Sequence, residues 1–248
     1  YFSSELVQNG NFSELGSEAV TNGDFSSTSD WALATGWTIN NSKLIGDSIF
    51  GNAVQDINFT NGKTYKVTFT ISDYVKGKVR FQFTGGSTVN GTARDADGVY
   101  TQYIVATANH TDFKLRGVSD SGGFTGSIDN VSVKQVDPND RWNLGGCWSF
   151  GDSVTLSDGT GNNSITQAIT LPTGKLRIKF DIITRTQGSV RLFINKPAFT
   201  ELLNVSEIGS YEINVDTTSG ANNIYFYATN LFIGSISNIS VVEVQGDR

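Results

Sequence analysis

The stretch Thr64–Ile71, TYKVTFTI, alternates polar and apolar residues without a break. A period of two places all of the apolar residues on one side of an extended chain. The stretch Leu176–Ile182, LRIKFDI, alternates in the same way in the second half of the chain. Both stretches predict strands with one buried and one solvated face, as in antiparallel sandwiches rather than parallel sheets.

The two stretches belong to an internal repeat. Landmarks recur at a spacing of 111 residues, so that Trp31 matches Trp142 and Trp37 matches Trp148. A fixed period of this kind indicates duplicated modules. We expect the matched tryptophans to have a shared role in the fold, two of them in the core and two as core or lid residues.

The pattern predicts an all-β fold with two tandem antiparallel jelly-roll-like β-sandwiches. The turn-rich sequence DPND, residues 137–140, falls between the two copies. The predicted first module therefore spans residues 1–137, with an extra N-terminal strand segment at 1–18, and the predicted second module spans residues 138–248.

A smaller duplication lies at the start of the chain. The sequence VQNGNFS at 7–13 resembles VTNGDFS at 20–26, at a spacing of 13 residues. We interpret the first of these as either an extra edge strand or the remnant of another module.

Composition excludes several classes of protein. A hydrophobic fraction of 38% with 11% aromatic residues is enough to build folded cores, and abundant Gly with only 3 Pro is typical of an all-β chain. The net charge of −6 lacks the basic footprint of a nucleic-acid-binding protein. No apolar stretch has transmembrane length, so we expect no membrane insertion. The start at Tyr1 and the absence of Met predict a processed or partial polypeptide.

We find no pattern of residues that predicts catalysis. His110 is the one histidine, and its polar neighbours at 108–112 predict a solvated loop. A nucleophile needs an adjacent base, and a zinc site needs several soft ligands, so neither chemistry is expected. The one cysteine, Cys147, allows no intramolecular disulfide. We therefore expect a protein that is not an enzyme.

Binding is the more promising chemistry, because sugars stack on aromatic faces and bond to amides, carboxylates and Arg. Alternation in the second copy turns six side chains toward solvent on one surface, provided that their strands lie in one sheet. These candidate glycan- or partner-binding residues are Tyr225, Tyr227, Phe193, Arg191, Lys179 and Asp181.

The first copy differs at the matching positions, where Lys114, Arg116 and Gln82 replace the aromatic residues. We therefore expect the two modules to bind different things. An alternative is that Tyr225 and Tyr227 pack on the first module or on a neighbouring subunit, because Tyr is enriched at interfaces.

The order of motifs resembles a known superfamily. NGDF at 22–25 is followed by Trp31, by Gly36-Trp37, by VRF at 79–81 and by SIDNV at 127–131. This order resembles the carbohydrate-binding-module-like, galactose-binding-like β-sandwiches. It looks particularly like the tandem copies of tailed-phage virion proteins and of secreted bacterial polysaccharide-degrading enzymes.

The resemblance implies a structural calcium ion in the first module, held between the opening segment and an acid on the closing strand. Asp129 matches the late ligand and Asp24 lies in the opening segment, but Ser26 stands where an early carboxylate is expected. Ser237 replaces the late acid in the second copy. Calcium prefers several carboxylate oxygens, so the implied site is incomplete in both copies.

The resemblance also implies a function. We expect a non-enzymatic virion surface protein, a capsid decoration or a head or tail fibre component of a tailed phage. Its modules would attach to other subunits, as in a homo-oligomer, or to host-surface polysaccharide. The alternatives are a carbohydrate-binding appendage of a secreted bacterial polysaccharide-degrading enzyme and a bacterial cell-surface adhesin.

Overall fold

The computed structural model describes residues 1–119, 122–157, 163–196, 198–218 and 220–245. Within these ranges the regular structure is antiparallel strand, without an α-helix, which confirms the predicted all-β sandwich class. No helix in the described part of the chain is long and apolar enough to cross a membrane. The chain forms two compact units. We call Leu15–Val136 the inserted module, and Tyr1–Glu14 together with the chain from Asp137 onward the split module.

The inserted module consists of two antiparallel sheets that enclose one core. Sheet I has the strand order β3-β4-β11-β6-β9, with β1 paired to β11. Its strands are β1 (Leu15–Glu18), β3 (Trp37–Asn40), β4 (Lys43–Ile49), β6 (Thr64–Lys76), β9 (Gly98–Val105) and β11 (Phe124–Val136). Sheet II has the order β2-β5-β10-β7-β8. Its strands are β2 (Ala32–Leu33), β5 (Asn52–Asp56), β7 (Val79–Thr84), β8 (Val89–Asn90) and β10 (Asp112–Gly117).

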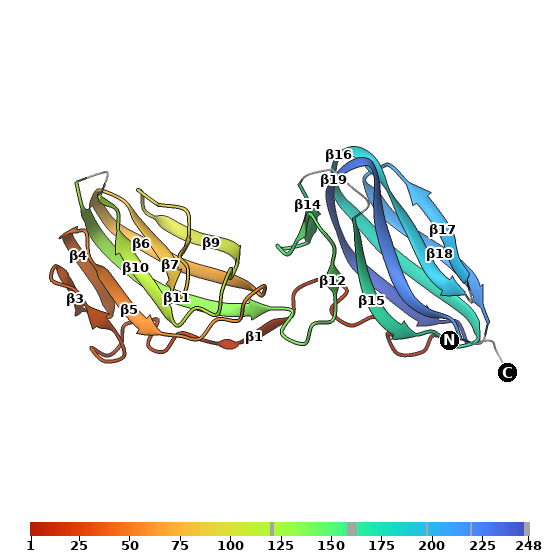
Figure 1. Ribbon diagram of the computed structural model, residues 1–248, viewed down its shortest axis with the longest axis horizontal. Coiled ribbons are helices and arrows are strands. Elements are labelled where there is room, and N and C mark those ends of the chain that lie inside the picture. Colours follow the sequence, from red (N-terminus) through yellow and green to blue (C-terminus); the bar gives the residue numbers. More distant parts are fainter. Residues whose placement is uncertain (120–121, 158–162, 197, 219, 246–248) are drawn as a thin grey trace. The chain divides into compact units, whose positions relative to one another are not determined.

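The split module repeats this strand order, but two long strands join its two halves into one eight-stranded sheet (Figure 1). We call the two halves of this sheet sheet I and sheet II, after their counterparts in the inserted module. Its strands are β12 (Asn143–Leu144), β13 (Trp148–Ser149), β14 (Val154–Leu156), β15 (Ser164–Thr170), β16 (Gly174–Lys196), β17 (Ala198–Val205), β18 (Gly209–Thr217) and β19 (Asn222–Glu243). Residues 174–182 of β16 pair with β18, and residues 190–196 pair with β17. The first half of β16 therefore belongs to sheet I, with β13, β14 and β18, and the second half belongs to sheet II, with β12, β15 and β17.

The cores are formed by the predicted alternating residues. Val67 and Phe69 are buried in the inserted module, and Ile178 and Phe180 are buried in the split module. The rings of Phe180 and Phe226 lie 5.0 Å apart, so the two halves of the long strands face each other across the core. The four matched tryptophans are also buried, which confirms their predicted core role; they are Trp31, Trp37, Trp142 and Trp148.

The structure corrects the assignment of the N-terminal residues to the first module. Residues 1–14 belong to the split module, because their backbone pairs with the closing strand β19: Leu6 donates to the carbonyl of Val241, and Ile239 donates to that of Gly10. Figure 1 draws this segment in red, beside β12 and β15. The Trp142 indole nitrogen donates to the carbonyl of Asn9 at 2.9 Å.

The duplication of 7–13 at 20–26 therefore represents two copies of one opening segment, one for each module. Gly10 and Gly23 occupy equivalent places, since a Cβ on either glycine would collide with a carbonyl oxygen of the closing strand, that of Ile239 or Val131. Phe12 packs on Trp142 in the split module in the same way as its counterpart Phe25 packs on Trp31. The inserted module thus interrupts the split module after its opening segment.

The prediction of a solvated His110 was wrong. Its side chain is 1% exposed and lies near the rings of Phe59 and Phe83, at centroid distances of 6.5 and 6.1 Å. Phe59 donates a backbone hydrogen bond to the His110 carbonyl, which holds the residue against the core. Neither ring nitrogen has a hydrogen-bond partner among the described residues.

Candidate functional site

The outer surface of sheet II in the split module carries four aromatic side chains, which we call the aromatic cluster. Its members are Phe193 on β16, Phe199 on β17, and Tyr225 and Tyr227 on β19. Strand register brings them together, because Phe193 is the Cα partner of Tyr225. They face away from the core because the intervening residues, such as Leu192 and Phe226, are buried in it.

The four rings of the aromatic cluster pack against one another. Phe199 stacks on Phe193 with centroids 4.4 Å apart and an interplanar angle of 8°. Phe199 also lies nearly perpendicular to Tyr225 and Tyr227, with centroid distances of 5.1 and 5.6 Å. Phe193, predicted to face solvent, is therefore only 7% exposed, while Phe199 is 49% exposed. Phe199 is the main solvent-facing ring of the cluster, and sequence analysis did not identify it.

Polar groups surround the aromatic cluster. The Tyr225 hydroxyl accepts hydrogen bonds from Asn195 Nδ2 at 3.2 Å and Asn223 Nδ2 at 3.1 Å. The Arg191 guanidinium lies 4.9 Å from the Phe193 ring centroid and forms an ion pair with Glu201. The hydrogen bond to Glu201 raises the pKa of Arg191, so this side chain stays charged at any physiological pH.

A polar groove begins beside Tyr225. A hollow of about 210 Å³ is lined by Asp140, Arg141, Asn143, Thr166, Ala168, Asn223 and Tyr225. A second hollow of about 310 Å³ shares Asp140, Arg141 and Ala168 with it and extends to Gln8 of the opening segment. The two hollows are neighbours because they share these three residues, and we call them together the polar groove. Amide, carboxylate and guanidinium groups line this groove, and Tyr225 lines one end of it.

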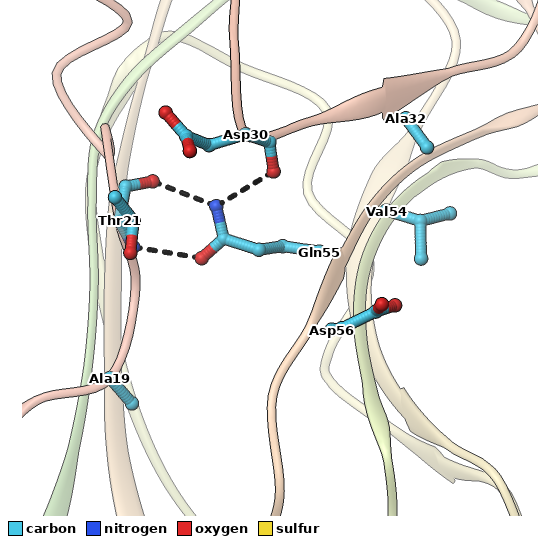
Figure 2. A pocket seen from close by; sticks show the side chains of 7 residues that line it. All are labelled: Ala19, Thr21, Asp30, Ala32, Val54, Gln55 and Asp56. Atoms are coloured by element: carbon cyan, nitrogen blue, oxygen red, sulfur yellow. Dashed lines mark hydrogen bonds between the residues drawn. The ribbon is translucent and has the colours of Figure 1, made fainter.

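The inserted module has a hollow of about 300 Å³ at the equivalent place (Figure 2). Gln55 forms its floor: its Nε2 donates to the carbonyls of Thr21 at 2.8 Å and Asp30 at 3.1 Å, and its Oε1 accepts from the Thr21 backbone at 2.8 Å. Gln167 holds Gln8 in the same way in the split module. Both glutamines are buried, and they form these hollows by fixing the opening segment beside sheet II.

The surface beside the hollow of the inserted module is polar rather than aromatic. Lys114 is the Cα partner of Gln82, and Arg116 is the Cα partner of Arg80. Gln82 is buried and donates to Asn90 Oδ1 at 2.6 Å. The two modules thus present different chemistry at equivalent positions.

Lys179 and Asp181 do not join the aromatic cluster. Both lie in the sheet I half of β16, with Phe180 between them directed into the core. Lys179 Nζ lies 2.6 Å from Glu212 Oε2, and its hydrogen bond lowers the pKa of that carboxyl. Asp181 Oδ2 accepts from Asn238 at 2.6 Å. Alternation identifies the solvated side of a strand but not the point at which the strand crosses from one sheet to the other.

Asp24 and Asp129, the acids of the implied calcium site, bind neighbouring groups of the chain. The Asp24 carboxylate accepts hydrogen bonds from the Ser26 backbone and hydroxyl, which lower its pKa. Asp129 accepts from the adjacent backbone of Asn130. The described ranges contain no group of three or more His, Cys, Asp or Glu side chains placed to hold a metal ion. These acids do not provide the carboxylate-rich ligand set that calcium prefers.

In the split module, the contact between the opening segment and the closing strand forms without an acid. Ser237, at the position of Asp129, donates its hydroxyl to the carbonyl of Asn11 at 3.4 Å. A direct hydrogen bond thus joins the opening segment to the closing strand in this copy.

No family model and no curated protein matches the chain. Among solved structures, the tandem CBM22 domain of a Paenibacillus barcinonensis protein is 8% identical, with a TM-score of 0.33, over 94% of this chain and 99% of that one. Allantoicase from Saccharomyces cerevisiae is 9% identical, with a TM-score of 0.35, over 96% and 92%. Tandem CBM51 modules of a family 98 glycoside hydrolase from Streptococcus pneumoniae are 6% identical, with a TM-score of 0.30, over 98% and 97%.

Proposed function

We propose that the chain is a non-catalytic binding protein that recognises a carbohydrate through sheet II of the split module. The observation that carries this proposal is the aromatic cluster at the end of the polar groove. Phe199 offers an exposed ring, and Tyr225 connects the cluster to the groove.

The chemistry suits a sugar chain. The axial hydrogens of one sugar ring can stack on Phe199, and the hydroxyls of the next can bond to groups such as Asn223, Asn143 and Arg141. Asn143, Thr166 and Tyr225 occupy one row across β12, β15 and β19, which gives the groove a fixed geometry. A rigid sheet holds such groups in place better than a loop does.

A second candidate function is attachment to a protein subunit through the same surface. Exposed aromatic residues and Arg are enriched in protein interfaces, and Phe199 with Arg191 provides both. The resemblance described above suggests a setting for each function: a tailed-phage virion surface for subunit attachment or host-glycan binding, and a secreted bacterial enzyme or adhesin for glycan binding.

The test combines a glycan array with calorimetric titration of the best glycan. We expect the Tyr225→Ala/Tyr227→Ala variant to lose at least about tenfold in affinity while its far-UV circular dichroism stays unchanged. A folded wild-type chain that binds no glycan would overturn the carbohydrate proposal. Analytical ultracentrifugation tests the second candidate for the case in which the subunit is another copy of the chain. That case predicts a self-associating wild-type chain that becomes monomeric in the double variant.

A further inference from the structure

Sheet II of the inserted module carries three cationic side chains on its outer surface, which we call the basic face. They are Arg80 on β7 and Lys114 and Arg116 on β10. Each alternates with a residue buried in the core, such as Phe81 or Leu115, so their side chains extend away from the core. This position is equivalent to that of the aromatic cluster in the split module.

Two of the cations directly oppose each other. Arg80 and Arg116 are Cα partners in neighbouring strands. Like charges placed directly opposite across a pair of strands are destabilising. Among the described residues neither arginine forms an ion pair, and Arg80 Nε is buried without a hydrogen-bond partner.

A second pair of opposed cations in the same module provides a contrast. Lys66 and Lys134 are Cα partners on β6 and β11, on the outer surface of sheet I. Lys134 lies 4.0 Å from the Glu18 carboxylate, and Lys66 lies over the Tyr103 ring at 5.3 Å. Both lysines therefore have a compensating neighbour within the chain. Arg80 and Arg116 have no ion pair among the described residues, so the terminal nitrogens of their guanidinium groups, rather than the buried Arg80 Nε, are the donors that an external anion would meet.

The basic face borders the hollow of Figure 2. Val54 lines that hollow and is the Cα partner of Lys114. Asp30 and Asp56 line it as well, and carboxylates there can accept hydrogen bonds from hydroxyl groups. Cationic donors for an anionic group therefore lie next to acceptors for neutral hydroxyls.

We propose that the basic face and its hollow bind an anionic polysaccharide that carries carboxylate or sulfate groups. Arg80 and Arg116 hold the anionic group, since guanidinium forks match carboxylate and sulfate oxygens. Lys114 adds a third charge, and the hollow binds the hydroxyls of an adjacent sugar. This second site is separate from the site of the split module and takes a charged ligand.

The surrounding charges favour this ligand over nucleic acid. Asp56 and Asp112 are Cα partners two residues along the strands from Val54 and Lys114, and the chain carries a net charge of −6. A continuous phosphate backbone would pass over these carboxylates, whereas a polysaccharide with separated anionic groups can place hydroxyls there.

The experiment measures binding of the full chain to four probes: polygalacturonate, dextran sulfate, neutral dextran and duplex DNA. The test variant is Arg80→Gln/Arg116→Gln. The matched control is Lys66→Gln/Lys134→Gln, which removes the same charge from the other sheet of the same module. Circular dichroism and thermal unfolding establish that both variants are folded.

We expect the wild-type chain to bind polygalacturonate or dextran sulfate, with an affinity that falls as NaCl is raised. The test variant should bind at least about tenfold more weakly, and the control should stay within about twofold of wild type. Equal loss in both variants, no binding to either anionic polymer, or tighter binding to DNA would overturn the proposal. Phe199→Ala should leave anionic-polymer binding unchanged, which separates this site from that of the split module.

Discussion

The side chain of Gln167 forms two hydrogen bonds of 2.7 Å with the backbone of Gln8, which lies 159 residues earlier in the chain. This pair joins the opening segment to β15 and forms one wall of the polar groove. Gln55 makes the equivalent bonds to Thr21 only 34 residues away. The split module therefore depends on a segment that precedes the whole inserted module in sequence.

Substitution of either glutamine should destabilise only its own module. Gln167→Ala leaves a backbone donor and a backbone acceptor of Gln8 without partners, which should lower the free energy of unfolding of the split module by about 1–3 kcal/mol. Gln55→Ala should do the same to the inserted module. Differential scanning calorimetry measures both. If the same unfolding transition moved to a lower temperature in both variants, this would contradict the assignment of one opening segment to each module.

The opening segments can also be tested through their glycines. Gly10→Ala places a Cβ against the Ile239 carbonyl, and we expect it to destabilise the split module. Gly23→Ala should destabilise the inserted module through the Val131 carbonyl. Hydrogen exchange resolves the two modules, because each variant should lose protection in one closing strand, β19 or β11. Unchanged protection in both variants would contradict the close contact between each glycine and the carbonyl oxygen of its closing strand.

His110→Phe should raise the stability of the inserted module. The imidazole is buried beside Phe59 and Phe83, and neither of its nitrogens has a partner among the described residues. Burial of polar atoms without a hydrogen bond is destabilising, and a phenylalanine ring has no such atoms. We therefore expect a gain of about 1 kcal/mol in the free energy of unfolding. Chemical denaturation at neutral pH measures it. A loss of stability would contradict this account of the buried imidazole.

The pair of Lys179 and Glu212 should give a small pH-dependent contribution to stability. Its hydrogen bond lowers the Glu212 pKa below its ordinary value of 4.5, so the stabilisation is present above that value and is lost as the pH falls through the lowered pKa. Both side chains are substantially exposed, so salt should weaken the effect. Glu212→Gln should therefore lower the melting temperature slightly at pH 7 and by less at pH 3. An equal difference at both pH values would contradict this.

Alternation and repetition were enough to predict the sandwich fold, since residues such as Val67 and Phe180 are buried as expected. The membership of residues 1–14 could not be predicted in this way. Likeness to 20–26 indicates two copies of the segment but not the distant strand that each one meets. Lys179 was misplaced because β16 is a single strand of 23 residues that serves both sheets. Phe199 was missed because its role depends on the pairing of β17 with β16.

The most direct test of the central claim is a glycan array probed in parallel with the wild-type chain, Phe199→Ala and Phe50→Ala. Phe50 is 48% exposed and lies in the inserted module, so it matches the exposure of Phe199 away from the aromatic cluster. We predict that wild type and Phe50→Ala bind the same neutral glycans and that Phe199→Ala loses them. Equal binding by all three chains, or binding by none while all three are folded, would contradict glycan recognition by the aromatic cluster.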